Sequence, residues 1–426
     1  MIRFLFQKLT YGFLVLFGVI TVVFFLFNLS PGDPVRNLVG ENASEKVVET
    51  MRRKLDLDLP AGKRFVLYLN DLSPLSIHNS SDPESRIYLD SSRYSYIGLF
   101  SFSKNRTLVA KKPYLKRSFL SDKNVSEILS EVMPGTVILA VVSIALSLIL
   151  GLFAGVIAAL KKDTFYDRLL LFVSAIGMSG PSFFVAIIVA WIGAILWRDQ
   201  IPIPWLLVFA LLFGVIALFF SRMKRKFISQ SSIGLLKKAG IGFLTVWAIA
   251  ALFLDESSFL NAGFYLPGTG LNMTGSLYSV DVWKGEYLDL KNMILPVITL
   301  MIRPLSVIVQ LTRSSLLDVL QQDFIRTARA KGITEFRVIA RHALRNALNP
   351  VITAVSGWFA SLLAGAVFVE FVFGWKGLGQ QMFTAIESRD MPVVMGGVIV
   401  IATAFVLINI LVDILYGWID PRVRIS

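Results

Sequence analysis

The sequence has no cysteine and only two histidines, His78 and His342. Without cysteine the chain has no disulfide bonds, no thiolate nucleophile and no cysteine-ligated metal or iron–sulfur site. The two histidines lie far apart in very different sequence contexts, so a zinc site is not expected either. No nucleophile–base pair stands out. We therefore predict no catalytic residues and no metal site, and an enzyme is the class that the sequence favours least.

Charged residues are also scarce. They make up 17% of the 426 residues, whereas soluble domains contain about a quarter, and 55% of the residues are hydrophobic. This balance favours a protein embedded in a bilayer. Lys and Arg number 42 against 29 Asp and Glu, a net charge of +13. In a membrane protein such an excess is typical of basic cytoplasmic loops, so we expect membrane lipid and no nucleic acid as a partner.

Long hydrophobic runs predict an all-α integral membrane protein with about eight transmembrane helices. The runs cover about 11–29, 134–160, 169–197, 205–220, 241–254, 293–311, 351–373 and 392–418. A cleaved signal peptide is the competing interpretation of the first run, but Asn28-Leu-Ser-Pro-Gly-Asp33 follows it instead of a small-x-small cleavage site. The two runs between 205 and 254 are alternatively a re-entrant hairpin, which leaves the topology elsewhere unchanged.

Basic residues set the predicted orientation. Arg3 and Lys8 hold the start of the first helix in the cytoplasm, and crossing the membrane at every run places both termini there. The predicted inner loops are basic, whereas the short outer loops are acidic or balanced. The loop 31–133 also carries many Lys and Arg, but loops longer than ~60 residues cross largely regardless of charge.

This long outer loop predicts a small extracytoplasmic α/β lobe. Apolar residues at three- and four-residue spacing predict helical structure over about 45–69. Residues from about 73 to 122 are rich in Ser, Asn, Lys and aromatics, which favours an irregular or β-containing structure.

The most informative segment is 321–350, which predicts two short helices between two membrane spans. The first, from about Asp323 to Lys331, ends at Gly332, because glycine takes the left-handed conformation that often follows a helix. Arg329 and Lys331 oppose the negative end of that helix. Thr334 is a candidate N-cap for the second helix.

The second predicted helix has two faces. Its apolar face consists of Phe336, Ile339, Ala340, Ala343, Leu344 and Ala347. Arg337, Arg341 and Arg345 recur every four residues as a basic stripe, and Asn349 and Pro350 supply N-cap and first position for the next span. An amphipathic hairpin lying on anionic lipid would explain the stripe. The glycine break between the helices instead favours an elbow that docks into a protein cleft.

The sequence of this segment resembles the cytoplasmic coupling loop of ABC importer permeases. The resemblance lies in Arg326-Thr-Ala-Arg-Ala-Lys-Gly332 and in Arg341-His-Ala-Leu-Arg-Asn-Ala347. The segment is similar to the version found in peptide-type (oligopeptide, dipeptide or nickel) systems. The general importer loop has Glu-Ala-Ala where this chain has Arg326-Thr-Ala328, and a proline where it has Arg345. Both departures suit the peptide-type branch.

Further segments extend the resemblance over roughly two thirds of the chain. They are Pro31-Gly-Asp-Pro34, Tyr166-Asp-Arg168, Pro181-Ser-Phe183, Leu311-Thr-Arg-Ser-Ser315, Glu370-Phe-Val-Phe-Gly-Trp-Lys-Gly-Leu-Gly379, Arg389-Asp-Met-Pro392 and Asp420-Pro-Arg422.

The resemblance implies a permease subunit of an ATP-driven importer in the bacterial cytoplasmic (inner) membrane, forming half of a path for peptides or a similar solute. The residues it assigns to ATPase coupling are Asp323, Arg326, Thr327, Ala328, Arg329, Ala330, Lys331, Gly332, Arg337, Arg341 and Arg345. No Gly-x-x-x-x-Gly-Lys-Ser/Thr loop is present, so ATP and Mg are expected on two separate ATPase subunits and no cofactor on this chain. The other implied partners are a second, homologous permease and an extracytoplasmic solute-binding protein, which meets the outer lobe and the loop 374–379.

The family pattern also divides the chain. Relatives have about six spans, so residues 201–256 are predicted to be an inserted transmembrane hairpin, and about 73–116 is extra sequence in the lobe. The predicted regions are a first helix at 1–30, the lobe at 31–133, two helices at 134–200, the hairpin at 201–256, and a core at 257–426 that contains the coupling loop 313–349.

Two charged residues fall within or beside predicted spans. Arg303 precedes Pro304 near the middle of one span, where a charge is costly and usually faces a cavity or a partner. It is a candidate path residue for a peptide carboxylate, although an ion pair with Asp413 or an interhelix contact explains it as well. Glu370 is interpreted as an interfacial or loop-anchoring residue. The rival classes are a secondary transporter, for which no internal repeat is visible, and a membrane anchor, which needs no elbow.

Overall fold

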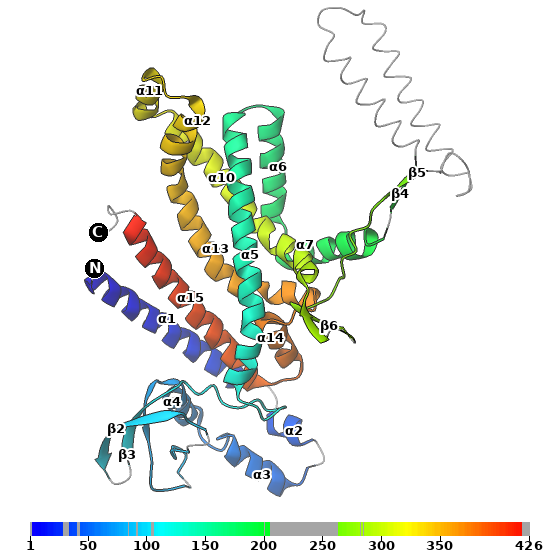
Figure 1. Cartoon of the computed structure of the whole chain (residues 1–426). Coiled ribbons are helices and arrows are strands. Elements are labelled where there is room, and N and C mark those ends of the chain that lie inside the picture. The colour runs from blue at the N-terminus through cyan, green and yellow to red at the C-terminus, as the bar shows by residue number, and fades with distance from the viewer. Residues whose placement is uncertain are drawn as a thin grey trace, which may run out of the picture. The chain divides into compact units, whose positions relative to one another are not determined.

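The structure is a computed structural model of the full chain, and Figure 1 traces it from end to end. It describes all residues except 1, 29–33, 41–42, 84, 91–92, 104–105, 200, 205–262, 282, 284 and 420–426. The described chain is mostly helical. It divides into a large unit, residues 1–188 and 274–426, and a small unit, residues 189–273, and each is described by itself.

The large unit is built around a bundle of long apolar helices. They are α1 (Ile2–Asn28), α5 (Val125–Leu160), α6 (Phe165–Ser179), α10 (Ile294–Leu320), α13 (Leu344–Val372) and α15 (Met391–Ile419). Helix α10 packs against α5, α6 and α13, while α1 packs against α15. By length and composition, four described helices are apolar enough to cross a membrane, and a bent pair is a fifth if it counts as one span. Sequence and structure thus agree on a helical membrane protein.

Glycines allow the central helices to approach closely. A Cβ atom added at Gly151 of α5 would lie 2.7 Å from Cγ2 of Ile308 on α10, and one at Gly155 would lie 2.6 Å from Cβ of Thr312. Small residues at such contacts let helix backbones pack tightly where no hydrophobic effect drives association.

The predicted run 169–197 is not one straight helix. Helix α6 ends at Ser179, and a bend of 110° separates it from a second helical stretch, Ser182–Leu196. That stretch consists of α7 (Ser182–Ala190) and the π-helix η1 (Trp191–Leu196). Gly180 and Pro181 lie at the break, and proline disfavours the helical conformation of the residue before it. The predicted runs at 205–220 and 241–254 lie outside the described residues.

The segment that follows α1 forms a small lobe. It contains α2 (Pro34–Val39), α3 (Glu45–Lys54), α4 (Ala61–Leu72) and the strands β1 (Leu75–His78), β2 (Tyr96–Ser103) and β3 (Arg106–Lys111). The strands form an antiparallel sheet in the order β1-β3-β2. The stretch 45–69 is helical as predicted, but it is divided into α3 and α4, because Asp56 takes a left-handed conformation (φ 60°) and Pro60 precedes α4.

Two contacts join the lobe to the helices. Helix α4 packs on α1 through rings that include Phe65 with Phe24 and Phe25, at centroid separations of 5.1 and 5.4 Å. The buried carboxylate of Asp390, just before α15, accepts hydrogen bonds from the Ser118 hydroxyl and from the Phe119 backbone N–H. In Figure 1 the lobe lies at one end of the large unit, and α11 and α12 lie at the opposite end.

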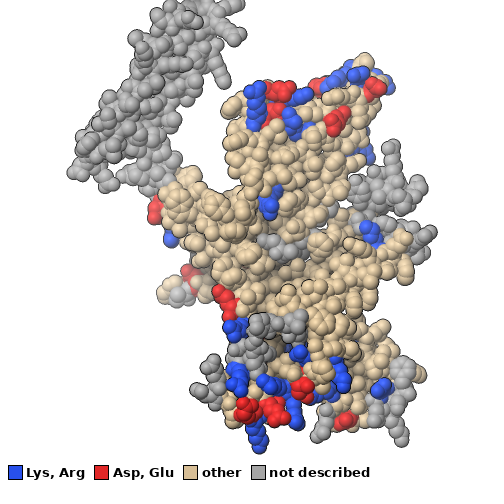
Figure 2. Space-filling model, turned by 180° about the vertical axis from the view of Figure 1, so that it is seen from behind, with Lys and Arg blue, Asp and Glu red and all other residues tan. Residues whose placement is uncertain are grey.

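The remaining elements are short. In the large unit they are β6 (Tyr278–Asp281), β7 (Gly285–Leu288), the 3-10 helix η2 (Leu290–Met293), α11 (Asp323–Ala330), α12 (Glu335–Arg337), the π-helix η3 (Val338–Ala343) and α14 (Leu378–Glu387). Strands β6 and β7 pair antiparallel, as do β4 (Ile201–Pro204) and β5 (Gly263–Leu266) of the small unit. On the face drawn in Figure 2, the charged side chains gather mainly at the two ends of the large unit, with a largely uncharged band between them.

Candidate functional site

The segment between α10 and α13 folds as a bent helical elbow, which we define as residues 323–343. Helix α11 ends where Gly332 turns left-handed, with φ of 74°. The N–H of Gly332 donates to the carbonyl of Arg329 at 2.9 Å, and the N–H of Ile333 donates to that of Ala328 at 3.3 Å. This is the Schellman arrangement, which satisfies the last carbonyls of a helix, and it confirms the predicted break at Gly332.

The elbow is anchored by a small hydrophobic cluster. Ile325, Ala328, Val338 and Ala343 are buried together with Ala159 of α5 and with Leu316 and Val319 of α10. Across the bend, the guanidinium of Arg329 donates two hydrogen bonds to the carboxylate of Glu335, at 2.6 and 3.1 Å. These hydrogen bonds hold the pKa of Glu335 below its ordinary value. The elbow therefore has a fixed shape relative to the ends of α5 and α10.

Polar and basic side chains cover the outside of the elbow. The exposed residues among those predicted for coupling are Asp323, Arg326, Thr327, Arg329, Ala330, Lys331, Gly332, Arg337, Arg341 and Arg345, whereas Ala328 is buried. Phe336 is also on the outside, with 82% of its surface exposed. Of the predicted apolar face, Phe336 and Ala340 are exposed, whereas Ala343 and Ala347 are buried. An exposed phenylalanine among arginines is the composition of an interface anchor.

The second half of the elbow is continuous with a membrane helix. Helix α12 passes through the wide turn of η3 directly into α13, without a break at Asn349 or Pro350. The expectation that these two residues start a new helix is wrong, because Pro350 lies inside α13. Thr334 occupies the N-cap position of α12, but its side chain makes no capping hydrogen bond.

A buried ion pair lies beside the elbow and was not predicted. Arg313 of α10 donates from Nε and Nη2 to the two carboxylate oxygens of Asp167 on α6, at 2.6 and 2.8 Å. The N–H of Asp163 donates to the same carboxylate at 2.9 Å, and Asp167 is 2% exposed. The two partners lie in the segments Tyr166-Asp-Arg168 and Leu311-Thr-Arg-Ser-Ser315. The sequence did offer a hint of this pair, because both segments belong to the family resemblance and one contains an acidic residue and the other an arginine.

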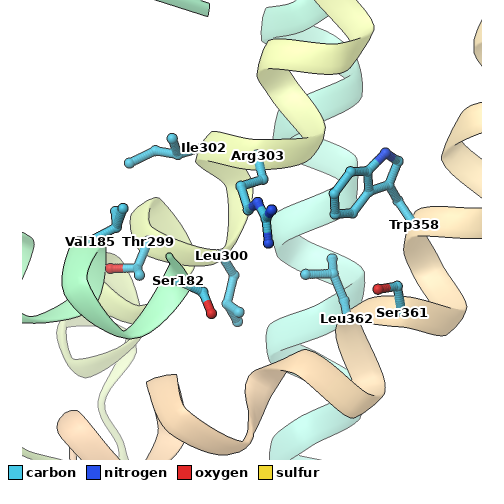
Figure 3. Close-up of a pocket in the computed structure, with 9 residues that line it drawn as sticks. All are labelled: Ser182, Val185, Thr299, Leu300, Ile302, Arg303, Trp358, Ser361 and Leu362. Carbon is cyan, nitrogen blue, oxygen red and sulfur yellow. The ribbon is translucent and has the colours of Figure 1, made fainter. Parts of the chain in front are cut away.

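Arg303 lines a small pocket between α7, α10 and α13. Its guanidinium lies 5.9 Å from the ring centroid of Trp358, within the range of a cation–π contact. Figure 3 shows the Arg303 side chain directed between Leu300 and Leu362, with Trp358 to one side. The hydroxyl-bearing residues Ser182, Thr299 and Ser361 also line the pocket. The side chain of Asp413, the alternative partner, is not among those that the structure describes.

The comparison with protein families decides the assignment. The family model of the binding-protein-dependent transport system inner membrane component matches residues 151–425, and the model of the N-terminal part of such components matches residues 1–80. The chain belongs to this family. It is a membrane permease subunit of an ABC importer and no enzyme, as the coupling-loop resemblance predicted.

Individual relatives of the permease support the same conclusion. It is 29% identical to the dipeptide transport system permease protein DppB of Alkalihalophilus pseudofirmus, with 96% of both chains covered. It is 31% identical to the di/tripeptide transport system permease protein DppB of Pseudomonas aeruginosa, covering 96% of this chain and 94% of the relative. Dipeptide transport system permease protein DppB of Escherichia coli is 49% identical over 174 residues, 41% of this chain and 48% of the relative.

At the opposite end of α13, the permease closes a loop over a buried carboxylate. Glu370 is fully buried and accepts hydrogen bonds from the N–H groups of Gly379 at 2.6 Å and Gln380 at 3.3 Å. The N–H of Leu378 donates to the hydroxyl of Thr136 on α5 at 2.7 Å. These contacts fit the interpretation of Glu370 as a loop-anchoring residue. Within the loop 374–379, Trp375 is buried and Lys376 is exposed.

Proposed function

We propose that this permease forms half of a translocation path for short peptides and couples to a separate ATPase through residues 321–350. The elbow carries the proposal. It presents Phe336 and its arginines outward from a bend held by Gly332 and by the Arg329–Glu335 pair. Because α12 and η3 continue into α13, a movement of the elbow displaces a spanning helix directly. Peptides are proposed as the solute because the relatives are dipeptide and di/tripeptide permeases.

The remaining partners follow from the same proposal. A second, homologous permease completes the path, two ATPase subunits hold ATP and Mg, and an extracytoplasmic solute-binding protein delivers the peptide. The elbow end, with its basic residues, faces the cytoplasm, as do both termini, which places the α/β lobe outside. Eight membrane spans, with an inserted hairpin at 201–256, complete the proposed topology of this bacterial inner-membrane protein.

The first experiment is affinity purification of the permease from its native membrane in mild detergent, with subunit identification and an ATPase assay. We expect a second permease and ATPase subunits to co-purify. Replacing Phe336 by Ala removes an exposed ring, at little cost to folding, and should weaken ATPase binding about tenfold if the ring is an interface anchor. Arg329→Ala and Gly332→Ala should act in the same direction.

The matched control is Phe13→Ala, which removes another exposed ring, from α1, far along the chain from the elbow. It should leave ATPase binding unchanged. If wild-type permease purifies alone, the proposed partner subunits are wrong. A secondary transporter or a membrane anchor then explains the result better. If ATPase subunits co-purify equally with the elbow variants, the elbow lies on lipid and docking occurs elsewhere. Uptake of nickel or sugar instead of dipeptides would contradict the proposed solute.

A further inference from the structure

Arg303 lies in a strongly apolar helix, at the fourteenth position of a span of 31 residues, Leu290–Leu320. A guanidinium at such depth is costly unless it faces a partner, a water-filled cavity or a ligand. Among the side chains that the structure describes, no carboxylate pairs with Arg303, and its one recorded contact is the face of Trp358. The residue is exposed to the pocket that it lines.

The other walls of the pocket suit an anion. Ser182 comes from α7 and Ser361 from α13, whereas the hydroxyl of Thr299 already donates its proton to the carbonyl of Leu295. Within the described residues, neither Ser182 nor Ser361 uses its hydroxyl in a hydrogen bond to the protein. One fixed cation with two free hydroxyl donors matches the needs of a carboxylate, which arginine binds with two parallel hydrogen bonds.

The size of the pocket limits the ligand. It holds about 60 Å³, the space of a few water molecules, so it accepts a terminal group and not a whole dipeptide. We propose that Arg303 binds the C-terminal carboxylate of the peptide during passage. Trp358 orients the guanidinium, and the hydroxyls of Ser182 and Ser361 donate further hydrogen bonds. This inference rests on the proposed peptide path and names the group of the solute that the permease itself recognises.

The lack of cysteine in this chain offers a direct test. Ser361→Cys places the only thiol of the chain in the pocket wall. The purified complex is labelled in nanodiscs without ATP, and the label on the permease is measured after the subunits are separated on a gel. Rates are measured with an anionic sulfonatoethyl and a cationic trimethylammonioethyl methanethiosulfonate. With Arg303 present, the anionic reagent should be favoured. Arg303→Gln should lower the ratio of anionic to cationic rates about tenfold, since a fixed charge in a poorly solvated site acts strongly at short range.

A second arm identifies the ligand. The dipeptide Ala-Ala should slow labelling of Ser361→Cys, whereas its C-terminal amide should not, and Arg303→Gln should abolish this difference. Arg303→Lys keeps the charge without the bidentate geometry and should protect to an intermediate degree. A thiol introduced by Ser81→Cys on the exposed lobe is the control, and its labelling should not respond to Arg303.

Two results overturn the inference: a labelling ratio that is unchanged in Arg303→Gln, or equal protection by the acid and the amide. In either case Arg303 is an interhelix contact to Trp358. Recovery of ATPase subunits with each variant shows that the complex has assembled. If the proposed ATPase partners are wrong, the wild-type permease will purify without an ATPase. That result differs from a failure of the carboxylate site, in which the ATPase co-purifies but labelling does not depend on Arg303.

Discussion

At the scale of single residues, the Asp167–Arg313 pair carries the largest predicted energetic effect. Removing one partner from a buried, hydrogen-bonded ion pair typically costs about 3–5 kcal/mol, because the other charge stays buried without compensation. Arg313→Ala leaves the carboxylate of Asp167 with only the N–H of Asp163. We expect a large loss of thermal stability of the purified permease, measured by unfolding in detergent, and weaker ATPase binding through the adjacent elbow.

Arg168→Ala is the control for this prediction. Arg168 is a neighbouring exposed arginine that donates only to the carbonyl of Asp163, so its removal should cost less than about 1 kcal/mol. Equal destabilisation by the two variants would show that the buried pair has no special role.

Also at the residue scale, His78 makes the lobe sensitive to acid. His78 ends β1, and its ring is buried against Tyr94, with Nδ1 donating to the carbonyl of Ile87 and Nε2 accepting from the Ser76 hydroxyl. Burial and the ammonium of Lys111 lower the pKa of His78. Because the unfolded chain takes up this proton near pH 6.5 and the folded lobe does so only at lower pH, stability is lost as pH falls below about 6.5.

Hydrogen exchange tests this sign. After correction for intrinsic rates, amide protection in β1 and β3 of the purified permease should be lower at pH 5.5 than at pH 7.5, two values chosen about one unit either side of 6.5. His78→Asn keeps a donor toward Ile87 but does not titrate, so it should shrink the difference. Asp71 acts in the opposite direction, because burial raises its pKa and protonation then favours the folded lobe. An unchanged pH effect in His78→Asn would assign the effect to another group.

At the scale of elements, the sequence was sufficient where a single residue decides the conformation. Gly332 predicted the end of α11, because few other residues accept a left-handed φ. The sequence was insufficient at Pro350, because proline is compatible with two positions in a helix. Pro350 suits the first turn of a helix, where its missing N–H costs nothing, but it is also tolerated inside a long helix at the price of one hydrogen bond. Neighbouring packing at Ala347 and Val351, both buried, holds α13 continuous through it.

The same reasoning explains what the sequence could not reveal about the site. The basic stripe of the elbow was predictable from spacing, but the exposure of Phe336 depends on the π-turn of η3, which shifts the helical register. The bidentate contact of Arg313 with Asp167 joins residues 146 positions apart, and no local pattern encodes such a contact.

The element-scale prediction concerns the bend itself. Gly332→Ala forces a Cβ into the left-handed region, at a cost of about 1–2 kcal/mol, although no atom lies within 4 Å of that Cβ. We expect the elbow to change its angle and transport to fall, while the helices remain folded, as measured by uptake into proteoliposomes and by circular dichroism. Gly18→Ala in α1 also has open space around its Cβ but an ordinary φ, and should leave transport unaffected. Equal uptake by the two variants would mean that the bend is not needed.

At the scale of the whole molecule, α13 links three sites that lie along its length. One end continues the elbow, the middle carries Trp358 and Ser361 of the pocket, and the other end carries Glu370 beneath the loop 374–379. A displacement of the elbow along this helix therefore reaches the pocket and the loop together. The far end of the loop is held against α13 by the N–H groups of Gly379 and Gln380, which donate to the Glu370 carboxylate.

Glu370→Ala removes these hydrogen bonds and leaves the buried N–H of Gly379 without its acceptor, at about 1–3 kcal/mol, together with the half-buried N–H of Gln380. We expect the loop to loosen, with faster hydrogen exchange at 373–380, while the elbow still binds the ATPase. Transport per ATP hydrolysed in proteoliposomes should then fall, because the ATPase still turns over but its motion no longer reaches the loop. Glu387→Ala removes an exposed carboxylate from the nearby α14 and should keep the wild-type ratio. If Glu370→Ala lowers uptake and ATPase activity in equal proportion, the loop is needed for assembly, and α13 does not act as the connecting element.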